Sequence, residues 1–462
     1  MKIGMSLWVL LLVTGIVVNA QVSPDLPPQP DPICQITNFP REYIGEVPIY
    51  ESPNYDLAVI GLLQQNETVQ SDGFIRIGDG VWFVVDHTGG IGFIWHDDIM
   101  APPNCPPVTV HGLSVPTPEI LDNKPLLAYV SNNEVHLWDG ERSINISPSP
   151  GARATQPVWS HQGELAWVAY PLNPINSDMN GIADILIWDG QQTFNLDLRL
   201  GLDLAPNGMP AWSVDGRLAW SGGEIENEEI YMWDGEKIIN VSQNTGRDTM
   251  PTWSSDGHLA WTSERDENAE IYVWDGEQII NISQNPDGDD RNASWSNDGR
   301  LAWGSGVNNN LEVLVWDGEQ VINVSQDAGW DAWHAWSDDG RLAWVSTRDD
   351  YQAVYLWDGE NTIRVSEANT NAANLNWAPD GRLAWQSERD QYHEIYIWDG
   401  EQVINFTQSP DTDAYSPRWN ADGWLAWVAD TGISWNIAVW DGEQIINVTD
   451  SRSINRYHTW AP

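Results

Sequence analysis

The chain has 462 residues, of which 30 are tryptophan, and its 67 acidic and 21 basic residues give a formal net charge of −46. Nucleic acids and anionic membrane surfaces attract basic proteins, so this charge argues against both as partners. An acidic surface attracts cations and basic proteins, or it only keeps a tryptophan-rich chain in solution. So many tryptophans form either a ligand-binding surface or one structural position that is used many times.

The first 20 residues resemble a secretory signal peptide. Lys2 precedes an apolar run over residues 7–18, and Val18-Asn19-Ala20 presents small side chains before a cleavage site at Gln21. We therefore expect a secreted or cell-envelope protein, with retention of this segment as a membrane anchor as the alternative. No later stretch is apolar enough to span a bilayer.

Residues 31–105 carry strand-length apolar runs separated by turn residues. Val81-Trp82-Phe83-Val84-Val85 and Ile91-Gly92-Phe93-Ile94-Trp95, for example, flank the turn His87-Thr88-Gly89-Gly90. This pattern predicts a small all-β barrel. Cys34 and Cys105 bound the unit, and an even pair in an exported chain predicts one disulfide, with two free thiols as the alternative.

Three short segments of this unit resemble the bacterial SH3-like domains. They are Ile49-Tyr50-Glu51-Ser52-Pro53, Gly80-Val81-Trp82-Phe83-Val84 and Gly92-Phe93-Ile94, although Phe93 stands where the family commonly has Trp. The resemblance implies a domain that binds cell-wall peptides or protein ligands. Residues 106–125 are rich in proline, which predicts a fairly extended, semi-rigid linker.

Residues 126–462 consist of eight copies of one unit of about 41 residues. Each unit contains a Leu-Ala-aromatic triplet, a Trp usually followed by Ser-x-Asp-Gly, a segment like Ile-Asn-Val-Ser, and Trp-Asp-Gly. The last motif begins at Trp138, Trp188, Trp233, Trp274, Trp316, Trp357, Trp398 and Trp440. Four short strands per unit, A to D, joined by Asp-Gly turns that supply positive φ angles, predict an all-β fold with an eight-bladed β-propeller.

The two ends of the repeat region complement each other. The first unit begins with strand B, Leu126-Leu127-Ala128-Tyr129, and has no strand A of its own. The last unit runs on to Thr459-Trp460-Ala461-Pro462, which is a surplus strand A. We expect this C-terminal strand to join the first blade and to close the ring, because closure removes two sheet edges.

The repeats resemble the WD40-like Trp-Ser-Pro-Asp-Gly repeats of TolB-type propellers. The resemblance rests on segments such as Trp377-Ala378-Pro379-Asp380-Gly381 and Glu394-Ile395-Tyr396-Ile397-Trp398-Asp399-Gly400. It implies the propeller fold and protein–protein interaction, and it implies no fixed chemistry.

The D–A and B–C loops vary in length and charge, so we expect any site on their face of the ring, near the central channel. The residue five before the strand-A tryptophan is an aspartate in three successive units, at Asp248, Asp290 and Asp331. We expect these aspartates to make one rim of the channel acidic. Such a rim binds a cation or a basic peptide segment, or its aspartates only cap turns in water.

Aromatic and basic residues lie in the same parts of several units. These candidate ligand-binding residues are Trp330, Trp333, His334, Tyr415, Arg456 and Tyr457. Trp330 and Trp333 either stack on a peptide or sugar or pack over the channel wall.

One inserted loop is a candidate calcium site. Asn176, Asp178, Asn180 and Asp184 stand at positions 1, 3, 5 and 9 of a segment with glycine at position 6. This spacing resembles the calcium loop of EF-hands, although Ile187 stands at position 12, where that loop has an acid. The alternative is a solvated polar loop, and no other cofactor is implied.

The sequence thus favours a secreted, non-enzymatic scaffold that binds a protein or peptide through the loop face of an acidic propeller, with the SH3-like domain as a second contact. A basic segment and a cell-wall component are the candidate partners. No serine-hydrolase elbow, phosphate loop or zinc-protease motif occurs. A carbohydrate-binding module and a hydrolase with an unrecognised site are the alternatives.

Overall fold

The computed structural model describes residues 125–462 except 148–151, 172–182, 197–205, 225–226, 308–309, 328, 350, 367–370, 390–391, 410 and 450–453, together with the backbone of eight strands between residues 9 and 95. The chain divides into two compact units, of which the second contains Pro118–Ser147 and Ala152–Pro462. The described elements are β-strands, which confirms the predicted all-β class. The described residues form no helix that could cross a membrane.

Six strands of the first unit form one sheet in the order β3-β6-β7-β8-β4-β5. Their bounds are β3 Gln35–Thr37, β4 Glu46–Tyr50, β5 Val59–Gln64, β6 Thr68–Ile77, β7 Gly80–His87 and β8 Gly90–Trp95. Within the predicted signal segment, β1 (Val9–Val13) pairs with β2 (Ile16–Ala20). Cys34 and Cys105 lie outside the described residues, so the disulfide stays a prediction, as does the SH3-like assignment.

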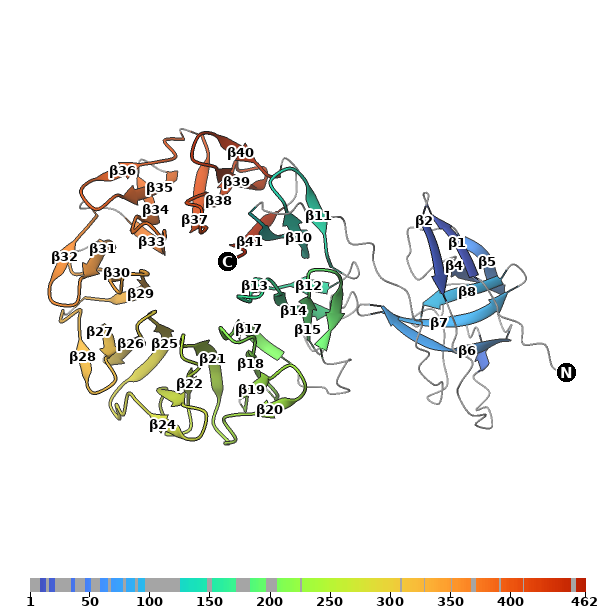
Figure 1. Cartoon of the computed structure of the whole chain (residues 1–462), viewed down its shortest axis with the longest axis horizontal. Coiled ribbons are helices and arrows are strands. Elements are labelled where there is room, and N and C mark those ends of the chain that lie inside the picture. Colours follow the sequence, from blue (N-terminus) through green and yellow to red (C-terminus); the bar gives the residue numbers. More distant parts are fainter. Residues whose placement is uncertain are drawn as a thin grey trace. The chain divides into compact units, whose positions relative to one another are not determined.

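The second unit is the predicted eight-bladed propeller (Figure 1). Blades 1 to 4 contain β9 Leu127–Ser131, β10 Glu134–Trp138, β11 Ser143–Asn145 and β41 Asn455–Trp460; β12 Ala152–Ala154, β13 Val158–Trp159, β14 Leu165–Pro171, β15 Asp184–Trp188 and β16 Thr193–Asn195; β17 Pro206–Trp212, β18 Leu218–Gly222, β19 Glu229–Trp233 and β20 Ile238–Asn240; and β21 Asp248–Trp253, β22 Leu259–Ser263, β23 Glu270–Trp274 and β24 Ile279–Asn281.

Blades 5 to 8 repeat the same antiparallel arrangement. They contain β25 Asp289–Trp295, β26 Leu301–Val307, β27 Asn310–Trp316 and β28 Val321–Asn323; β29 Asp331–Trp336, β30 Leu342–Ser346, β31 Ala353–Trp357 and β32 Thr362–Arg364; β33 Asn371–Trp377, β34 Leu383–Arg389, β35 Tyr392–Trp398 and β36 Val403–Asn405; and β37 Asp413–Trp419, β38 Leu425–Asp430, β39 Trp435–Trp440 and β40 Ile445–Asn447.

The strands A lie innermost around the centre of the ring (Figure 1), and each contacts the strand A of both neighbouring blades. The strand-A tryptophan joins one blade to the next. In blade 4, Trp253 packs edge-on against Trp274 of its own blade, with ring centroids 6.5 Å apart, and its Nε1 donates to the Ala211 carbonyl of blade 3 at 3.0 Å. The strand-B tryptophans, such as Trp261, are fully buried between the sheets.

The predicted ring closure is confirmed. The C-terminal strand β41 pairs with β9, with Asn455 opposite Ser131 and Trp460 opposite Leu127. It also makes the inter-blade bonds of an ordinary strand A, because Trp460 Nε1 donates to the Arg418 carbonyl at 2.9 Å. The last segment of the chain therefore joins the first blade to the eighth.

Candidate functional site

Each of six inner strands carries a β-bulge three residues before its tryptophan. The bulged residues have φ angles between 53° and 61°, and they are Met250, Asn292, Trp333, Asn374, Ser416 and Tyr457. A left-handed backbone is costly for a residue with a side chain, by about 1–3 kcal/mol. Three of these side chains are large and exposed, since Met250 is 55%, Trp333 49% and Tyr457 36% accessible.

The three aspartates that were expected to form an acidic rim do not lie at the surface. Asp248, Asp290 and Asp331 are fully buried, so they do not line an exposed rim. The reason is the fully buried strand-B tryptophan beside each of them, whose indole N–H needs an acceptor. Trp303 Nε1, for example, donates to Asp290 Oδ1 at 3.2 Å. The residues that reach solvent are the bulged ones, two positions nearer the tryptophan.

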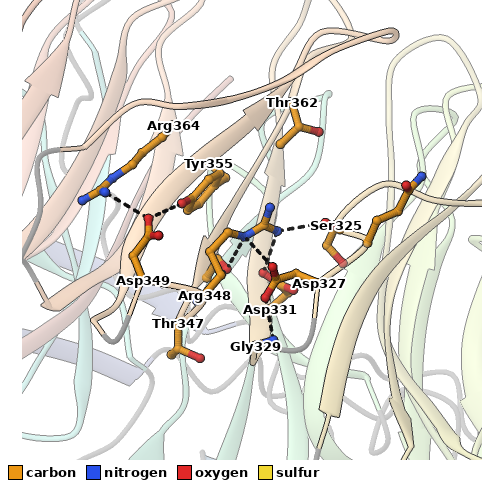
Figure 2. A network of polar contacts seen from close by, with 12 residues as sticks. Ser325, Asp327, Gly329, Asp331, Thr347, Arg348, Asp349, Tyr355, Thr362 and Arg364 are labelled. Carbon is orange, nitrogen blue, oxygen red and sulfur yellow. Dashed lines mark hydrogen bonds and ion pairs between the residues drawn. The ribbon is translucent and has the colours of Figure 1, made fainter.

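Two of these aspartates are paired with an arginine of their own blade. Figure 2 shows Arg348 beside Asp331, at 3.3 Å from Nη2 to Oδ1. Burial raises the pKa of Asp331, and the Arg348 guanidinium opposes that shift. Arg265 lies 3.5 Å from Asp248 in the same way. Asp290 has no ion pair within the described residues, and burial, with the nearby Glu270 carboxylate, raises its pKa to about 6.

A cavity of about 220 Å³ lies between blades 5 and 6, and the predicted residues Trp333 and His334 form part of its wall. Its lining is Asn292, Ser294, Gly304, Leu311, Ala332, Trp333 and His334. Trp330 packs edge-on against Trp333, with ring centroids 4.7 Å apart. Burial lowers the pKa of His334 to about 4, so its imidazole is neutral at pH 7. Aromatic and apolar walls with a few polar groups are typical of small-ligand sites.

A second cluster joins blades 7 and 8 at strand ends beside the D–A and B–C loops. Nδ1 of His393 lies 3.4 Å from Oδ1 of Asp413, and the His393 backbone N–H donates to the same oxygen at 2.6 Å. The ring of Tyr415 packs 4.8 Å from the imidazole, centroid to centroid. The ring centroid of Trp435 lies 6.3 Å from that of Tyr415, and Trp435 is partly exposed.

Two more carboxylates belong to this cluster, which we call the His393 cluster. Asp430 stands directly opposite Asp413 in the β37–β38 ladder, and Glu388 stands opposite His393 in the β34–β35 ladder. Burial and the carboxylates of Asp413, Asp430 and Glu388 raise the pKa of Tyr415 to about 12. The phenol therefore stays protonated at neutral pH, as a hydrogen-bond donor among acceptors.

The structure places the predicted residue Tyr415 in the His393 cluster, whereas the sequence did not point to His393 or to the three carboxylates. The available signal was positional, because Glu388, His393, Asp413 and Asp430 all stand at strand ends next to variable loops. The remaining predicted residues are not brought together with them. Arg456 and Tyr457 lie on β41 in blade 1, with the guanidinium 5.5 Å from the Tyr457 ring centroid.

The candidate calcium loop falls mostly outside the described residues, which include neither Asn176, Asp178 nor Asn180. Asp184 is described, and it begins β15 opposite Ala169. Within the described part of the chain, no group of three or more His, Cys, Asp or Glu side chains is arranged to hold a metal ion. Calcium binding by this loop stays a prediction.

No family model and no curated protein matches this chain. Among solved structures, the β-propeller domain of the Trilobed protease from Pyrococcus furiosus is 14% identical with a TM-score of 0.46, over 65% of this chain and 97% of that one. Dipeptidyl peptidase 4 from Porphyromonas gingivalis is 15% identical with a TM-score of 0.49, over 65% of this chain and 53% of that one. TolB from Acinetobacter baumannii is 17% identical with a TM-score of 0.36, over 67% and 82%.

These likenesses show the propeller fold, and the chain spans about half the length of the dipeptidyl peptidase. The comparison also corrects the expected function: it gives no support to a scaffold that binds a protein or peptide, because several of the similar structures are peptidases, among them a puromycin-hydrolysing peptidase of Mycobacterium tuberculosis.

Proposed function

We propose that this chain is a hydrolase whose active site is the His393 cluster, with His393 as the general base. The observation that carries the proposal is the pair of His393 and Asp413. The carboxylate accepts from the backbone of His393 and faces its Nδ1, which leaves Nε2 to take a proton. A carboxylate at Nδ1 fixes the ring orientation and stabilises the imidazolium that forms during proton transfer.

The groups around this pair suit the hydrolysis of an ester or amide by water. His393 takes a proton from the attacking water, and the protonated ring then returns it to the leaving group, so that the proton balance closes. The protonated phenol of Tyr415 supplies a donor for the oxygen that becomes negative in the tetrahedral intermediate. Trp435 offers an exposed ring on which an apolar part of the substrate can pack.

The test is turnover by the full chain across a panel of chromogenic esters and short peptides. His393→Gln removes the base, and we expect it to lower kcat at least 100-fold. His258→Gln is the matched control, because His258 also lies 3.4 Å from an aspartate, Asp256, but next to an A–B turn on the opposite face. Equal activity of the two variants, or no turnover by the native chain, contradicts the proposal.

A second candidate function rests on the cavity between blades 5 and 6. Its volume of about 220 Å³ accommodates a single sugar-sized ring, and Trp333 presents a half-exposed face beside it. Carbohydrates commonly stack on such faces. We expect binding on a glycan array to disappear in a Trp330→Ala/Trp333→Ala variant and to persist in Tyr457→Ala, which changes the equivalent bulge of blade 1. Loss in both variants would contradict a site at this cavity.

We also propose that the chain is secreted and that its first unit is an SH3-like domain. The support is the signal-like segment over residues 1–20 and the three motifs within residues 31–105. The expected mature protein begins at Gln21 and carries a Cys34–Cys105 disulfide. Mass spectrometry of the exported protein, with and without reduction, checks both. A retained signal segment or two free thiols would contradict the respective part.

A further inference from the structure

Blades 4, 5 and 6 form an internal comparison at one buried position. Each has a fully buried aspartate on strand A, at Asp248, Asp290 and Asp331. Each aspartate accepts a hydrogen bond from the strand-B tryptophan of its own blade, at 3.0, 3.2 and 3.1 Å. The carboxylate and the indole are therefore constant across the three blades, and any difference between them lies in the other neighbours.

An arginine occupies the space beside this aspartate in blade 6. The guanidinium of Arg348 donates to Oδ1 of Asp331 at 3.3 Å and to the Ser325 carbonyl at 3.0 Å (Figure 2). It also donates to Oγ of Ser346 at 2.9 Å. It also lies over the ring of Tyr355, 4.2 Å from the centroid. We call this set of groups the guanidinium box.

Blade 4 repeats the serine, aspartate and tyrosine contacts of the guanidinium box. Nε of Arg265 donates to Ser263 Oγ at 2.8 Å, Nη2 lies 3.5 Å from Asp248 Oδ1, and the guanidinium lies 4.2 Å from the Tyr272 ring centroid. The sequence signature of a filled box is therefore Ser-x-Arg at the end of strand B, together with aspartate on strand A and tyrosine on strand C.

Blade 5 has the aspartate and the serine of the box, Asp290 and Ser305, and lacks the arginine. Strand B ends in Ser305-Gly306-Val307, so valine holds the place of the arginine, and Leu314 holds the place of the tyrosine. Oδ2 is buried without a hydrogen bond in both Asp290 and Asp331, so the two blades differ at Oδ1, which accepts from Arg348 in blade 6 and from no arginine in blade 5. Asn285 of the preceding blade donates to Ser305 Oγ at 3.1 Å, and so replaces the bond that arginine makes to the equivalent serine in blades 4 and 6.

A second carboxylate lies near Asp290 and increases the electrostatic effect of the missing cation. Glu270 of blade 4 interacts with Asp290, and it is itself bonded by Ser283. Glu229 and Glu312 hold the equivalent positions next to blades 4 and 6, each bonded by its own serine. The two acidic positions thus recur in blades 4, 5 and 6, and blade 5 lacks the positive charge that accompanies them in blades 4 and 6.

We propose that blade 5 binds a guanidinium group from outside the chain at Asp290, in the place that Arg265 and Arg348 fill from within. In blades 4 and 6 the box lies one arginine side chain below the surface, because the side chains of Arg265 and Arg348 are 19% and 17% exposed. A guanidinium that binds in blade 5 would enter by the equivalent route. A planar guanidinium suits the box better than an ammonium, because its N–H groups point outward in one plane toward the carboxylate, hydroxyl and carbonyl acceptors around it. The group belongs either to an arginine side chain of a peptide or to a free guanidino compound.

Calorimetric titration of the full chain tests this proposal. The probes are methylguanidinium, the peptide Gly-Arg-Gly and its lysine counterpart Gly-Lys-Gly. We expect at least one guanidinium probe to bind and Gly-Lys-Gly to bind at least tenfold more weakly. Tighter binding of the peptide identifies an arginine side chain as the source, and equal or tighter binding of methylguanidinium identifies a free compound. No binding of either guanidinium probe, or equal binding of the lysine peptide, overturns the proposal.

Val307→Arg fills the box from within and is the decisive variant. We expect it to fold and to lose at least tenfold in affinity for the guanidinium probe that binds. Thr431→Arg is the matched control, because residue 431 holds the same repeat position in blade 8, where Ala414 replaces the aspartate. Unchanged binding in Val307→Arg, or an equal loss in Thr431→Arg, would contradict the site. The readout is binding and not turnover, so its failure is distinct from failure of the proposed hydrolase.

Discussion

At the scale of single residues, the same side chain has different properties according to the charge beside it. Asp248 and Asp331 each share their buried site with an arginine, whereas Asp290 has a carboxylate and hydroxyls near it and no arginine. Burial without a counter-charge favours the protonated acid. The difference originates in one position per blade, since Val307 replaces the arginine.

The raised pKa of Asp290 predicts a specific dependence of stability on pH. The folded state holds its proton up to about pH 6, whereas the unfolded chain releases it near pH 4. The contribution of Asp290 to stability is therefore complete below pH 4 and is lost as the pH rises through 6, by an amount on the order of 3 kcal/mol. Urea unfolding between pH 4 and 7 should show a shallower decline for Asp290→Asn than for the native chain.

Asp248→Asn is the control for this measurement. It removes the carboxylate from Arg265 and leaves a buried guanidinium without its ion pair, so we expect lower stability at pH 7 than in the native chain. A decline between pH 4 and 6 that is the same in Asp290→Asn and in the native chain would contradict the assignment to Asp290.

At the scale of elements, the bulge of each inner strand decides which side chains reach solvent. Strict alternation along a strand would make residues five and three before the tryptophan point the same way. The bulge breaks that alternation, with a register shift between Thr249 and Thr252 in blade 4. As a result the aspartates are buried, and Met250, Trp333 and Tyr457 are exposed.

The backbone strain of a bulge predicts an unusual effect of glycine. Met250 has a φ of 58° and an exposed side chain, so glycine relieves strain there and loses little packing. We expect Met250→Gly to raise the free energy of unfolding by about 1 kcal/mol, the strain less the entropic cost of glycine. Thr252→Gly, two residues along the same strand, should lower it. Destabilisation of both variants by similar amounts would argue against strain at the bulge.

At the scale of the whole molecule, the ring is held by interactions that the repeat makes between blades and by one closing strand. The closing strand β41 pairs with β9 and accepts the Trp159 Nε1 bond of blade 2 at its Thr459 carbonyl, at 3.2 Å. Loss of this strand would expose the edge of β9 and remove the contact of blade 1 with blade 8.

Truncation after Asp450 tests the closure. It deletes β41, and we expect a fall in Tm of more than 10 °C, because the loss of several paired backbone groups and of buried Trp460 exceeds the effect of a point substitution. Removal of Pro462 only is the control, since β41 then remains intact. Equal Tm values for the two truncated chains would contradict closure by the C-terminal strand.

Much of the fold could be predicted because its signals are local and repeated. In blade 4, the run Glu270-Ile271-Tyr272-Val273-Trp274 before an Asp-Gly turn predicts strand C, and β23 has these bounds. The run Ile279-Ile280-Asn281-Ile282-Ser283 predicts strand D, but β24 ends at Asn281, and the Ser283 hydroxyl donates to Glu270. The tertiary contact ended the strand where the local pattern would have continued.

The sequence by itself determined the number of blades, the order of the strands and the closing strand, because turn chemistry and the repeated tryptophans act within about 40 residues. Only the tertiary structure decided which polar side chains are buried and which ones meet. His393 and Asp413 come together because strands of neighbouring blades pack side by side, and Asp290 lies near Glu270 because the two carboxylates come from neighbouring blades. Such charges interact through space, and no local pattern records their distances.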